Sequence, residues 1–279
     1  MISSKSNQRI KRIHKLLNKG KSRREERCFV VEGIKVVREA LRQGLAEEIY
    51  VSEEFQVEDG IPVTDTISAS VFREISDTVT PQGVMAVVRM PEYDSEDIFL
   101  RDRCRLLCLE GVRDPGNVGT MIRTAEAAGM DAVLLSADCA DVFQPKVVRS
   151  TMGAILRVPC LIADMLSGMR SSGGAGCDIS DHTGKHEKVG DVRGSDFPEV
   201  MEALQAKGFT LYAAHLQGAV DYREPSYEGR IGILIGNEAK GLSDEVTALS
   251  DVCVKIPMQG EVESLNAAVS AALLMYETI

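Results

Sequence analysis

The sequence predicts an α/β protein with two domains, a small one in front and a larger one built on a parallel sheet. At 279 residues the chain is long enough to form two cores. Short apolar runs alternate with helical patterns from residue 28 onward, which is typical of sheets covered by helices. The acidic stretch PEYDSED at 91–97 separates a shorter set of these elements from a longer one.

The first 27 residues differ from the rest of the chain in charge. The whole chain has a net charge of −10, but residues 1–27 hold ten Lys or Arg against Glu25 and Glu26, a local net of +8. Ile10, Ile13 and Leu16 recur near helical spacing among these bases, which predicts a short amphipathic helix. A basic segment on an acidic body is typical of a protein that binds a polyanion, and the alternative is a merely solvated helix.

The front domain is predicted to contain three strands and two helices. The strands are CFVVEG at 28–33, EEIYVS at 47–52 and GVMAVVRM at 83–90. Helical patterns cover 35–44, which ends at a glycine, and 69–76. The predicted boundaries are a basic arm at 1–27, the front domain at 28–90, a linker at 91–103 and the larger domain at 104–279.

The larger domain shows a second alternation of strands and helices. Its predicted strands are 105–109, 131–135, 154–158, 209–214, 231–235 and 252–256. Its predicted helices are 117–128, 197–207 and 263–278. A stretch at 170–195 is rich in Gly, Ser, Asp and Lys, has almost no aliphatic residues, and is predicted to be a flexible surface insertion.

Composition excludes several classes of protein. The sequence has no run of eighteen apolar residues and no apolar leader at its N-terminus, so neither a membrane span nor a secreted protein is expected. The seven cysteines lie at irregular spacing, some within apolar runs, which favours a reduced, cytoplasmic setting. Cys177, His182 and His186 lack a fourth ligand, so no metal site is predicted. A dinucleotide fingerprint and a P-loop are both absent.

Three segments that follow predicted strands carry the polar residues of a candidate site. The first is EGVRDPGNVGTMIRTAEAAG at 110–129, where Asn117 suits a helix start. Val118, Met121, Ile122 and Ala125 would form the buried face of this helix, with Arg123 on its polar face. Open α/β sheets place ligands at the carboxyl ends of their strands, which makes this arginine a candidate site residue.

The second segment contains a loop bounded by glycines, and the third ends in a helical pattern rich in small residues. In IGILIGNEAKGLSDEV at 231–246, Gly236 and Gly241 bracket a tight loop, and Ser243 is placed to cap the next helix. In VCVKIPMQGEVESLNAAVSAALLMYE at 252–277, a strand ends at Ile256 and a helix is expected to begin near Ser264. Its core stripe is predicted as Leu265, Val269, Leu273 and Tyr276, with a small-sided flank of Ala267, Ala268, Ser270, Ala271 and Ala272.

Taken together, the three segments resemble the signature motifs of the SpoU (TrmH-like) RNA ribose 2′-O-methyltransferases of the SPOUT superfamily. The match lies in NVGTMIRTAEAAG, IGNEAKGLS and IPMQGEVESLNAAVSAA, in family order, and KVVRSTMGAILRVP at 146–159 is also similar. The front domain resembles the small substrate-binding domain that precedes many members. The resemblance implies a parallel-sheet catalytic domain with a C-terminal trefoil knot. The small-sided flank permits close helix approach, either inside the core or across a subunit interface, and we predict a homodimer packed through it.

The resemblance also implies a cofactor and its ligands. S-adenosylmethionine is expected in the knot, held mainly by main-chain atoms of the second and third motifs. The positions that match are Gly236, Asn237, Gly241, Ile256, Met258 and Leu265, with Ala214 at the end of a strand. The family motif commonly has glycine where this chain has Ala239, and the insertion at 170–195 is not a family feature.

The expected catalytic residues are carried over from the same motifs: Asn117, Arg123, Glu238, Ser264 and Asn266. The family arginine is often described as the general base for the ribose hydroxyl. A guanidinium is effectively always protonated, so binding the target phosphate and stabilising the developing alkoxide is chemically easier for Arg123. The resemblance favours ribosomal RNA as substrate, and thus a role in rRNA processing. Transfer RNA and a non-catalytic RNA-binding protein are the alternatives.

Overall fold

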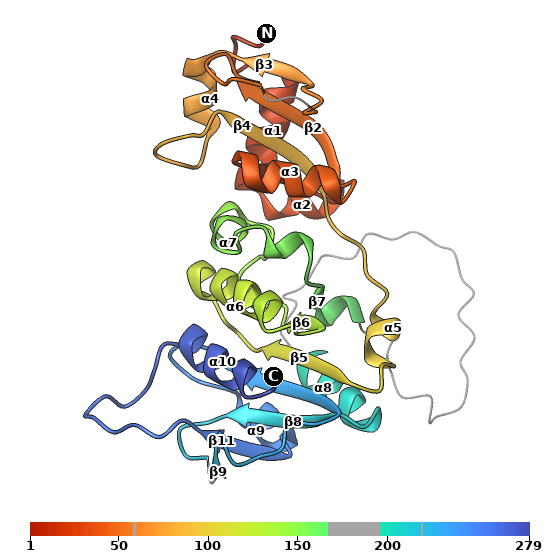
Figure 1. Ribbon diagram of the computed structural model, residues 1–279, viewed down its shortest axis with the longest axis vertical. Coiled ribbons are helices and arrows are strands. Elements are labelled where there is room, and N and C mark those ends of the chain that lie inside the picture. The colour runs from red at the N-terminus through yellow and green to blue at the C-terminus, as the bar shows by residue number, and fades with distance from the viewer. Residues whose placement is uncertain (58–59, 167–195, 219) are drawn as a thin grey trace, which may run out of the picture. The chain divides into compact units, whose positions relative to one another are not determined.

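The computed structural model describes residues 1–57, 60–166, 196–218 and 220–279 (Figure 1). The predicted insertion at 170–195, with Cys177, His182 and His186, lies outside these residues. Two compact units are present, and each is treated by itself. The first comprises residues 1–94, 114–129 and 140–159, and the second comprises 95–113, 130–139 and 160–279.

The first unit contains a four-stranded sheet in the order β1-β4-β2-β3. Its strands are β1 (Cys28–Glu32), β2 (Ala46–Ser52), β3 (Asp65–Ile67) and β4 (Val84–Arg89). Strand β4 runs antiparallel to β1 and β2, whereas β3 runs parallel to β2. Its helices are α1 (Gln8–Asn18), α2 (Gly20–Glu26), α3 (Ile34–Arg42), α4 (Ala69–Ile75), α6 (Pro115–Ala127) and α7 (Pro145–Ser150). The predicted α/β front domain is therefore present, with β3 as an additional strand.

Helix α1 belongs to the core of this sheet. The predicted amphipathic pattern is confirmed, because Ile10, Ile13 and Leu16 are buried in one cluster with Tyr50 and Val87. A buried arginine, Arg23, joins this helix to the chain ahead of α7. It donates to the Leu16 carbonyl at 2.6 Å and to Asp141 Oδ2 at 2.7 Å. Residues 1–27 thus share the core of the front domain.

The second unit is a seven-stranded sheet in the order β7-β6-β5-β10-β8-β11-β9. Its strands are β5 (Cys104–Leu109), β6 (Ala132–Leu135), β7 (Cys160–Ile162), β8 (Thr210–Ala214), β9 (Val220–Asp221), β10 (Arg230–Ile235) and β11 (Val252–Lys255). Every neighbouring pair is parallel, so the predicted parallel sheet is confirmed. Its helices are α5 (Ser95–Phe99), α8 (Asp196–Ala206), α9 (Asp244–Leu249) and α10 (Ala267–Tyr276).

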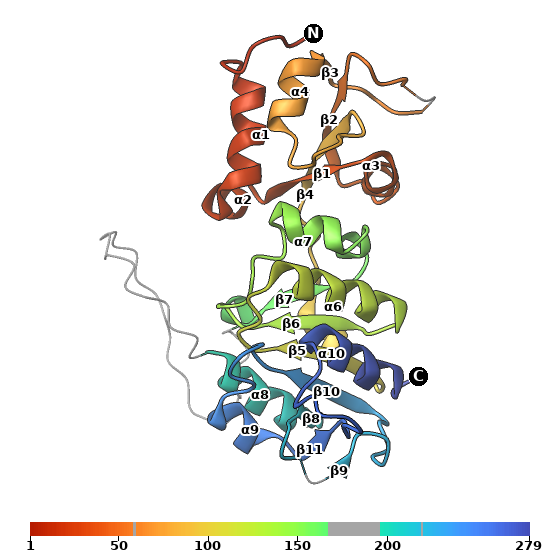
Figure 2. The ribbon, with the colours of Figure 1, turned by 90° about the vertical axis from the view of Figure 1, so that its left-hand side faces the viewer.

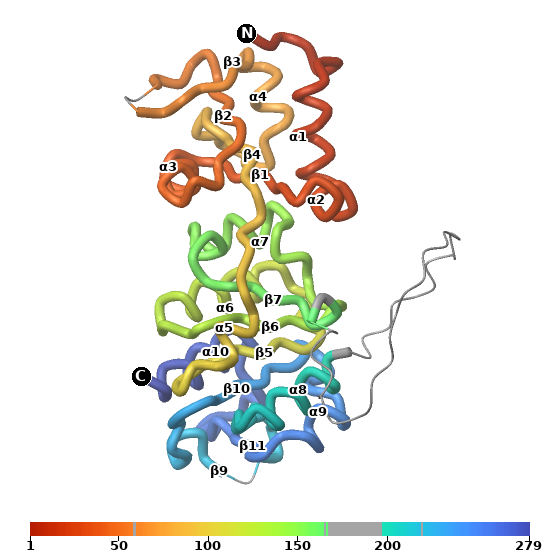
Figure 3. The backbone as a smooth tube through the Cα atoms, turned by 90° about the vertical axis from the view of Figure 1, so that its right-hand side faces the viewer, coloured from red at the N-terminus to blue at the C-terminus, as the bar shows by residue number. Residues whose placement is uncertain are grey.

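The strand order determines where a ligand would lie. The chain moves from β5 to β6 and β7 on one side, and β10 then pairs with the opposite edge of β5. Such a change of direction opens a crevice at the carboxyl ends of the strands. Helix α10 contacts β10, and α8 packs beside α9 (Figures 2 and 3). No helix of the described ranges has the length and apolar character that crossing a membrane requires.

Two expectations about elements were wrong. The apolar run 154–158 is not a strand. Gly153 has φ +91°, and a short 3-10 helix, Ala154–Leu156, follows it. Its residues are nevertheless buried, which is why the run reads like a core strand.

The second correction concerns α10. It begins at Ala267 with Asn266 as its cap, not near Ser264. Its buried residues are Ala268, Ala271, Leu274 and Met275. Val269 and Tyr276, predicted for the core, are 48% and 57% exposed. The flanking residues are small and apolar, so the spacing of the larger apolar residues predicted the wrong buried face for α10.

Candidate functional site

The loop after β10 is held in shape by Asn237. Its backbone N–H donates to the Gly241 carbonyl at 3.0 Å, and the Gly241 N–H donates back at 2.8 Å. The side-chain Oδ1 accepts the N–H groups of Ala239 and Lys240 at 3.0 and 3.1 Å. Gly241 has φ +74°, a left-handed conformation that favours glycine. The predicted tight loop is thus closed by its own second residue.

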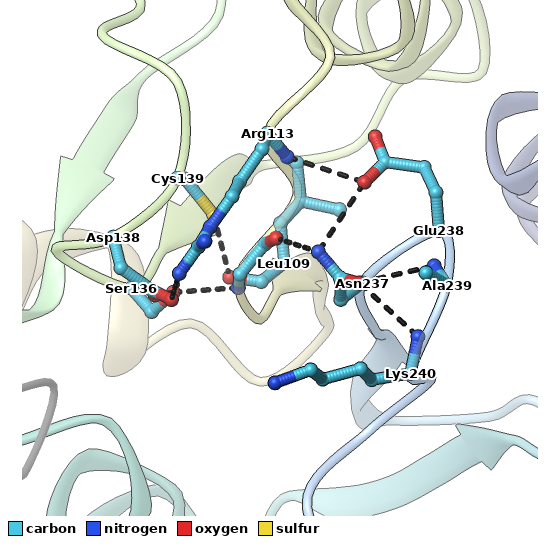
Figure 4. Close-up of polar contacts among 10 residues, drawn as sticks. Leu109, Arg113, Ser136, Asp138, Cys139, Asn237, Glu238, Ala239 and Lys240 are labelled. Atoms are coloured by element: carbon cyan, nitrogen blue, oxygen red, sulfur yellow. Dashed lines mark hydrogen bonds and ion pairs between the residues drawn. The ribbon is translucent and has the colours of Figure 1, made fainter.

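Two side chains of this loop fasten it to the loop after β5 (Figure 4). Asn237 Nδ2 donates to the Gly111 carbonyl at 2.7 Å. Glu238 Oε2 accepts the backbone N–H of Arg113 at 3.3 Å. Strands β5 and β10 are neighbours in the sheet, so the two loops meet at the same edge although they are far apart in sequence. Two of the predicted site residues, Asn237 and Glu238, therefore both contact the loop after β5.

The loop after β6 also contacts the loop after β5. Ser136 Oγ accepts the Gly111 N–H at 2.8 Å and donates to Asp138 Oδ1 at 2.6 Å. The Arg113 guanidinium, largely exposed, lies 3.3 Å from Asp138 Oδ2 (Figure 4). The Cys139 thiol donates to the Leu109 carbonyl at 3.3 Å, and burial raises the pKa of this thiol.

A carboxylate fixes the far end of the β10 loop. Glu110 accepts the Ser243 backbone N–H at 2.8 Å and the Ser243 hydroxyl at 2.6 Å. The same hydroxyl accepts the N–H of Val246, so Ser243 caps α9 as predicted. The loop is therefore attached to the end of β5 at both of its ends.

Two glycines mark places where main chains approach closely. A Cβ on Gly236 would lie 2.1 Å from the Gly241 carbonyl carbon, and a Cβ on Gly218 would lie 2.7 Å from that of Val254. Any other residue would force the backbone apart at both places. The Gly236 contact lies within the loop after β10, and the Gly218 contact joins the loop after β8 to strand β11. Glycine leaves its main-chain groups without a covering side chain, which fits a cofactor held by backbone atoms.

The remaining expected cofactor positions lie at the end of β8 and between β11 and α10. Ala214 is half-buried at the end of β8, and Ile256 and Met258 are half-buried after β11. Leu265 is also half-buried, whereas Ser264 is exposed. Asn266 caps α10, because its Oδ1 accepts the N–H groups of Ala268 and Val269 at 2.8 and 3.3 Å. The side chain of Asn266 is thus used at least partly for structure.

Asn117 and Arg123 lie on α6, in the first unit. The helix starts at Pro115, and its cap is Asp114, whose Oδ1 accepts the Asn117 N–H at 2.8 Å. Asn117 is therefore inside the first turn and not at the helix start. The predicted buried face of Val118, Met121, Ile122 and Ala125 is confirmed, and Arg123 is exposed.

Several residues of this site are not among the predicted ones: Glu110, Arg113, Ser136 and Asp138. Glu110 and Arg113 lie in the first motif, in EGVRDP. Their position directly after a predicted strand could have identified them as candidate site residues. Their partners lie elsewhere in the sequence, so only the pairing of β5 with β6 and β10 reveals the contacts. Within the ranges described, no group of three His, Cys, Asp or Glu side chains is placed to hold a metal ion.

Comparison with known proteins gives two family matches. The profile of the SpoU rRNA Methylase family matches residues 105–179 and 178–276. The profile of the MRM3-like substrate binding domain matches residues 7–86, a range that includes helix α1.

Individual proteins resemble the chain over nearly its whole length. The 23S rRNA (guanosine(2553)-2′-O)-methyltransferase RlmP of Bacillus subtilis is 32% identical over 99% of this chain and 97% of its own. An S-adenosylmethionine-bound rRNA methyltransferase from Sinorhizobium meliloti superposes with a TM-score of 0.78, at 27% identity, over 99% of this chain and 96% of its own. The methyltransferase AviRb from Streptomyces viridochromogenes, in complex with the same cofactor, has a TM-score of 0.75 at 25% identity, over 98% and 97%.

Proposed function

Because the chain belongs to the SpoU rRNA methylase family, we infer that it is an S-adenosylmethionine-dependent methyltransferase acting on a ribose 2′-hydroxyl of ribosomal RNA. One structural observation carries this inference: the glycine-bounded loop after β10 is fastened to the loop after β5 at the carboxyl edge of a parallel sheet. Ligands bind at this edge in open α/β sheets. The match of residues 7–86 to a substrate-binding domain supports an RNA substrate.

We propose that main-chain groups of the loops after β8, β10 and β11 hold the cofactor. Gly236, Ile256 and Leu265 are its proposed contacts, with Ala214, Asn237, Gly241 and Met258 around them. When bound, S-adenosylmethionine supplies an electrophilic methyl group on a sulfonium. The tight contacts at Gly236 and Gly218 leave these loops little room to rearrange, so they would orient the cofactor without reorganisation.

We propose Arg123, Asn117, Glu238, Ser264 and Asn266 as the residues that act on the RNA. The guanidinium of Arg123 stays protonated, so it would bind the target phosphate and stabilise the alkoxide that forms on the ribose. Asn117 and Glu238 would orient Arg123 or the ribose. Ser264 and Asn266 would position the hydroxyl and the cofactor loop. In an in-line displacement, positioning of this kind supplies much of the rate.

We propose that the protein forms a homodimer through a face of α10 that differs from the expected one. Ala268 and Ala271 are buried in the unit's own core. Val269 and Tyr276 are 48% and 57% exposed, and Leu273 between them is half-buried. An apolar stripe that the chain leaves exposed fits a second copy of the same helix. The C-terminal trefoil knot remains a prediction of the family resemblance.

A methyl-transfer assay tests the proposed function. The protein is incubated with S-adenosylmethionine carrying a labelled methyl group and with unmodified ribosomal RNA transcripts or transfer RNA transcripts. A ribose 2′-O-methyl group blocks alkaline cleavage at its own position, so label should appear in alkali-resistant dinucleotides from ribosomal RNA. Label in transfer RNA alone would assign the other substrate. RNA binding without any transfer would favour a non-catalytic protein.

A further inference from the structure

Three lysines lie on α1 or directly after it. Lys11, Lys15 and Lys19 follow one another at intervals of four residues, and all three are exposed. Lys11 and Lys15 are about one helical turn apart on α1, and Lys19 follows the helix as its C-cap in an extended conformation. The three lysines form a row in that they line the same groove. Among the described residues, none of the three makes an ion pair with a carboxylate.

The row lines a groove of about 470 Å³. Its lining residues come from α1, from α4 and from the segments next to α1. Helices α1 and α4 contact each other and lie side by side in Figure 2. Buried Ile10 and Ile75 line it as well, together with His14, Lys5 and Glu74. Glu74 is the only acid among the groove's lining residues, and it already pairs with Lys5. The groove is therefore strongly positive on a protein whose net charge is −10.

Most other cations near the N-terminus are paired. Arg9 lies 3.0 Å from Asp65, and Arg12 lies 2.6 Å from Glu26. Buried Arg23 is paired with Asp141 at 2.7 Å. The positive charge of residues 1–27 is thus largely neutralised by ion pairs outside the groove. Inside the groove it is not.

Helix stability does not account for the row. Lys15 is in the last turn of α1, where a cation interacts favourably with the helix dipole. Lys11 lies near the other end, where the same interaction is unfavourable. Lys11 and Lys15, four residues apart on the helix, also repel each other, which costs the helix a few tenths of a kcal/mol. A row that weakens its own helix and faces a groove suits an anionic ligand with regularly spaced charges.

We propose that the groove between α1 and α4 binds the sugar-phosphate backbone of the substrate RNA through Lys11, Lys15 and Lys19. This assignment rests on the proposed function, which supplies RNA as the polyanion. Lysine ammonium groups contact phosphates as point charges and carry no base sequence information. The groove therefore holds the RNA in place, and the catalytic domain selects the nucleotide.

The test removes the row and compares it with a matched loss of charge. One variant carries Lys11→Gln, Lys15→Gln and Lys19→Gln, which removes the three charges and keeps a similar helix propensity. The control carries Lys21→Gln, Arg42→Gln and Arg73→Gln, three cations that are 81%, 71% and 63% exposed, lie outside the groove and each pair with a glutamate. Binding of a mixed-sequence 30-nucleotide RNA is measured over a salt series, with melting temperature and S-adenosylmethionine affinity alongside.

The groove variant should bind RNA roughly a hundredfold more weakly at 0.1 M salt, with a slope of log K against log salt about 2 smaller, because three phosphate contacts are lost. Its cofactor affinity and melting temperature should match the wild type, and the control should keep most of its RNA affinity. Equal affinities and slopes for the two variants would overturn the assignment of the groove. Methyl transfer by wild-type protein is assayed separately, so loss of the proposed function would be seen independently of RNA binding.

Discussion

The carboxylate of Glu110 holds Ser243 by two hydrogen bonds, one to its backbone N–H at 2.8 Å and one from its hydroxyl at 2.6 Å. Glu110 follows β5, and Ser243 ends the proposed cofactor loop after β10. A single side chain thus sets the distance between two loops that belong to different motifs. This contact should affect how tightly the cofactor is held.

Glu110→Ala should weaken S-adenosylmethionine binding about tenfold, since hydrogen bonds to a charged group contribute about 1.5–3 kcal/mol. Calorimetric titration measures the change. Ser243→Ala removes the hydroxyl bond and the cap of α9, and the double variant should be little weaker than Glu110→Ala alone. Fully additive losses would show that the two residues act separately.

Gly236→Ala should reduce cofactor affinity by roughly a hundredfold, because its Cβ would lie 2.1 Å from a backbone carbon of Gly241 and would open the loop. Overpacking of this kind costs about 3 kcal/mol. Gly260→Ala is the matched control, since a Cβ there meets nothing within 4 Å. Unchanged binding by the Gly236 variant, at an unchanged melting temperature, would remove this loop from the cofactor site.

Val269→Glu combined with Tyr276→Glu should convert the protein from dimer to monomer, because both side chains lie on the exposed stripe of α10. Multi-angle light scattering at micromolar concentration reports the mass. Leu100→Glu, at a residue that is 61% exposed and distant in sequence from α10, should leave the mass unchanged. A wild-type monomer would refute the dimer outright.

Much of the fold could be predicted because its pattern follows from burial. On α6 one face is apolar and the other polar, so the period alone identified Val118 and Ile122 as core residues. On α10 both faces are apolar, and the period could not distinguish the buried Ala271 from the exposed Val269. Which face of α10 is buried depends on how closely the helix approaches β10, and tertiary packing determines that distance.

The candidate site was predictable only in part for a similar reason. Its motif residues were found through the family resemblance. The contacts that hold them, such as Glu238 with the N–H of Arg113 and Glu110 with Ser243, join residues 125 and 133 positions apart. They exist because β10 pairs with β5, and a single sequence does not specify which strands are neighbours.

Arg123 should be required for methyl transfer and dispensable for folding. It is exposed on the polar face of α6, whose opposite face forms the core contacts, so Arg123→Ala should leave the melting temperature nearly unchanged. Transfer to RNA should fall about a thousandfold, the upper range for losing one preorganised donor to a developing oxyanion. Cofactor affinity should stay within twofold of wild type, because the proposed cofactor contacts are on other loops.

Arg123→Lys should also fail, since a point charge cannot replace the planar fork of a guanidinium. The control is Arg42→Ala, a comparably exposed arginine on α3 that should keep full activity. Substantial transfer by Arg123→Ala, measured in single turnover at saturating RNA, would mean that another group stabilises the ribose oxygen. A joint loss of transfer and thermal stability would instead assign the residue to the structure of the helix.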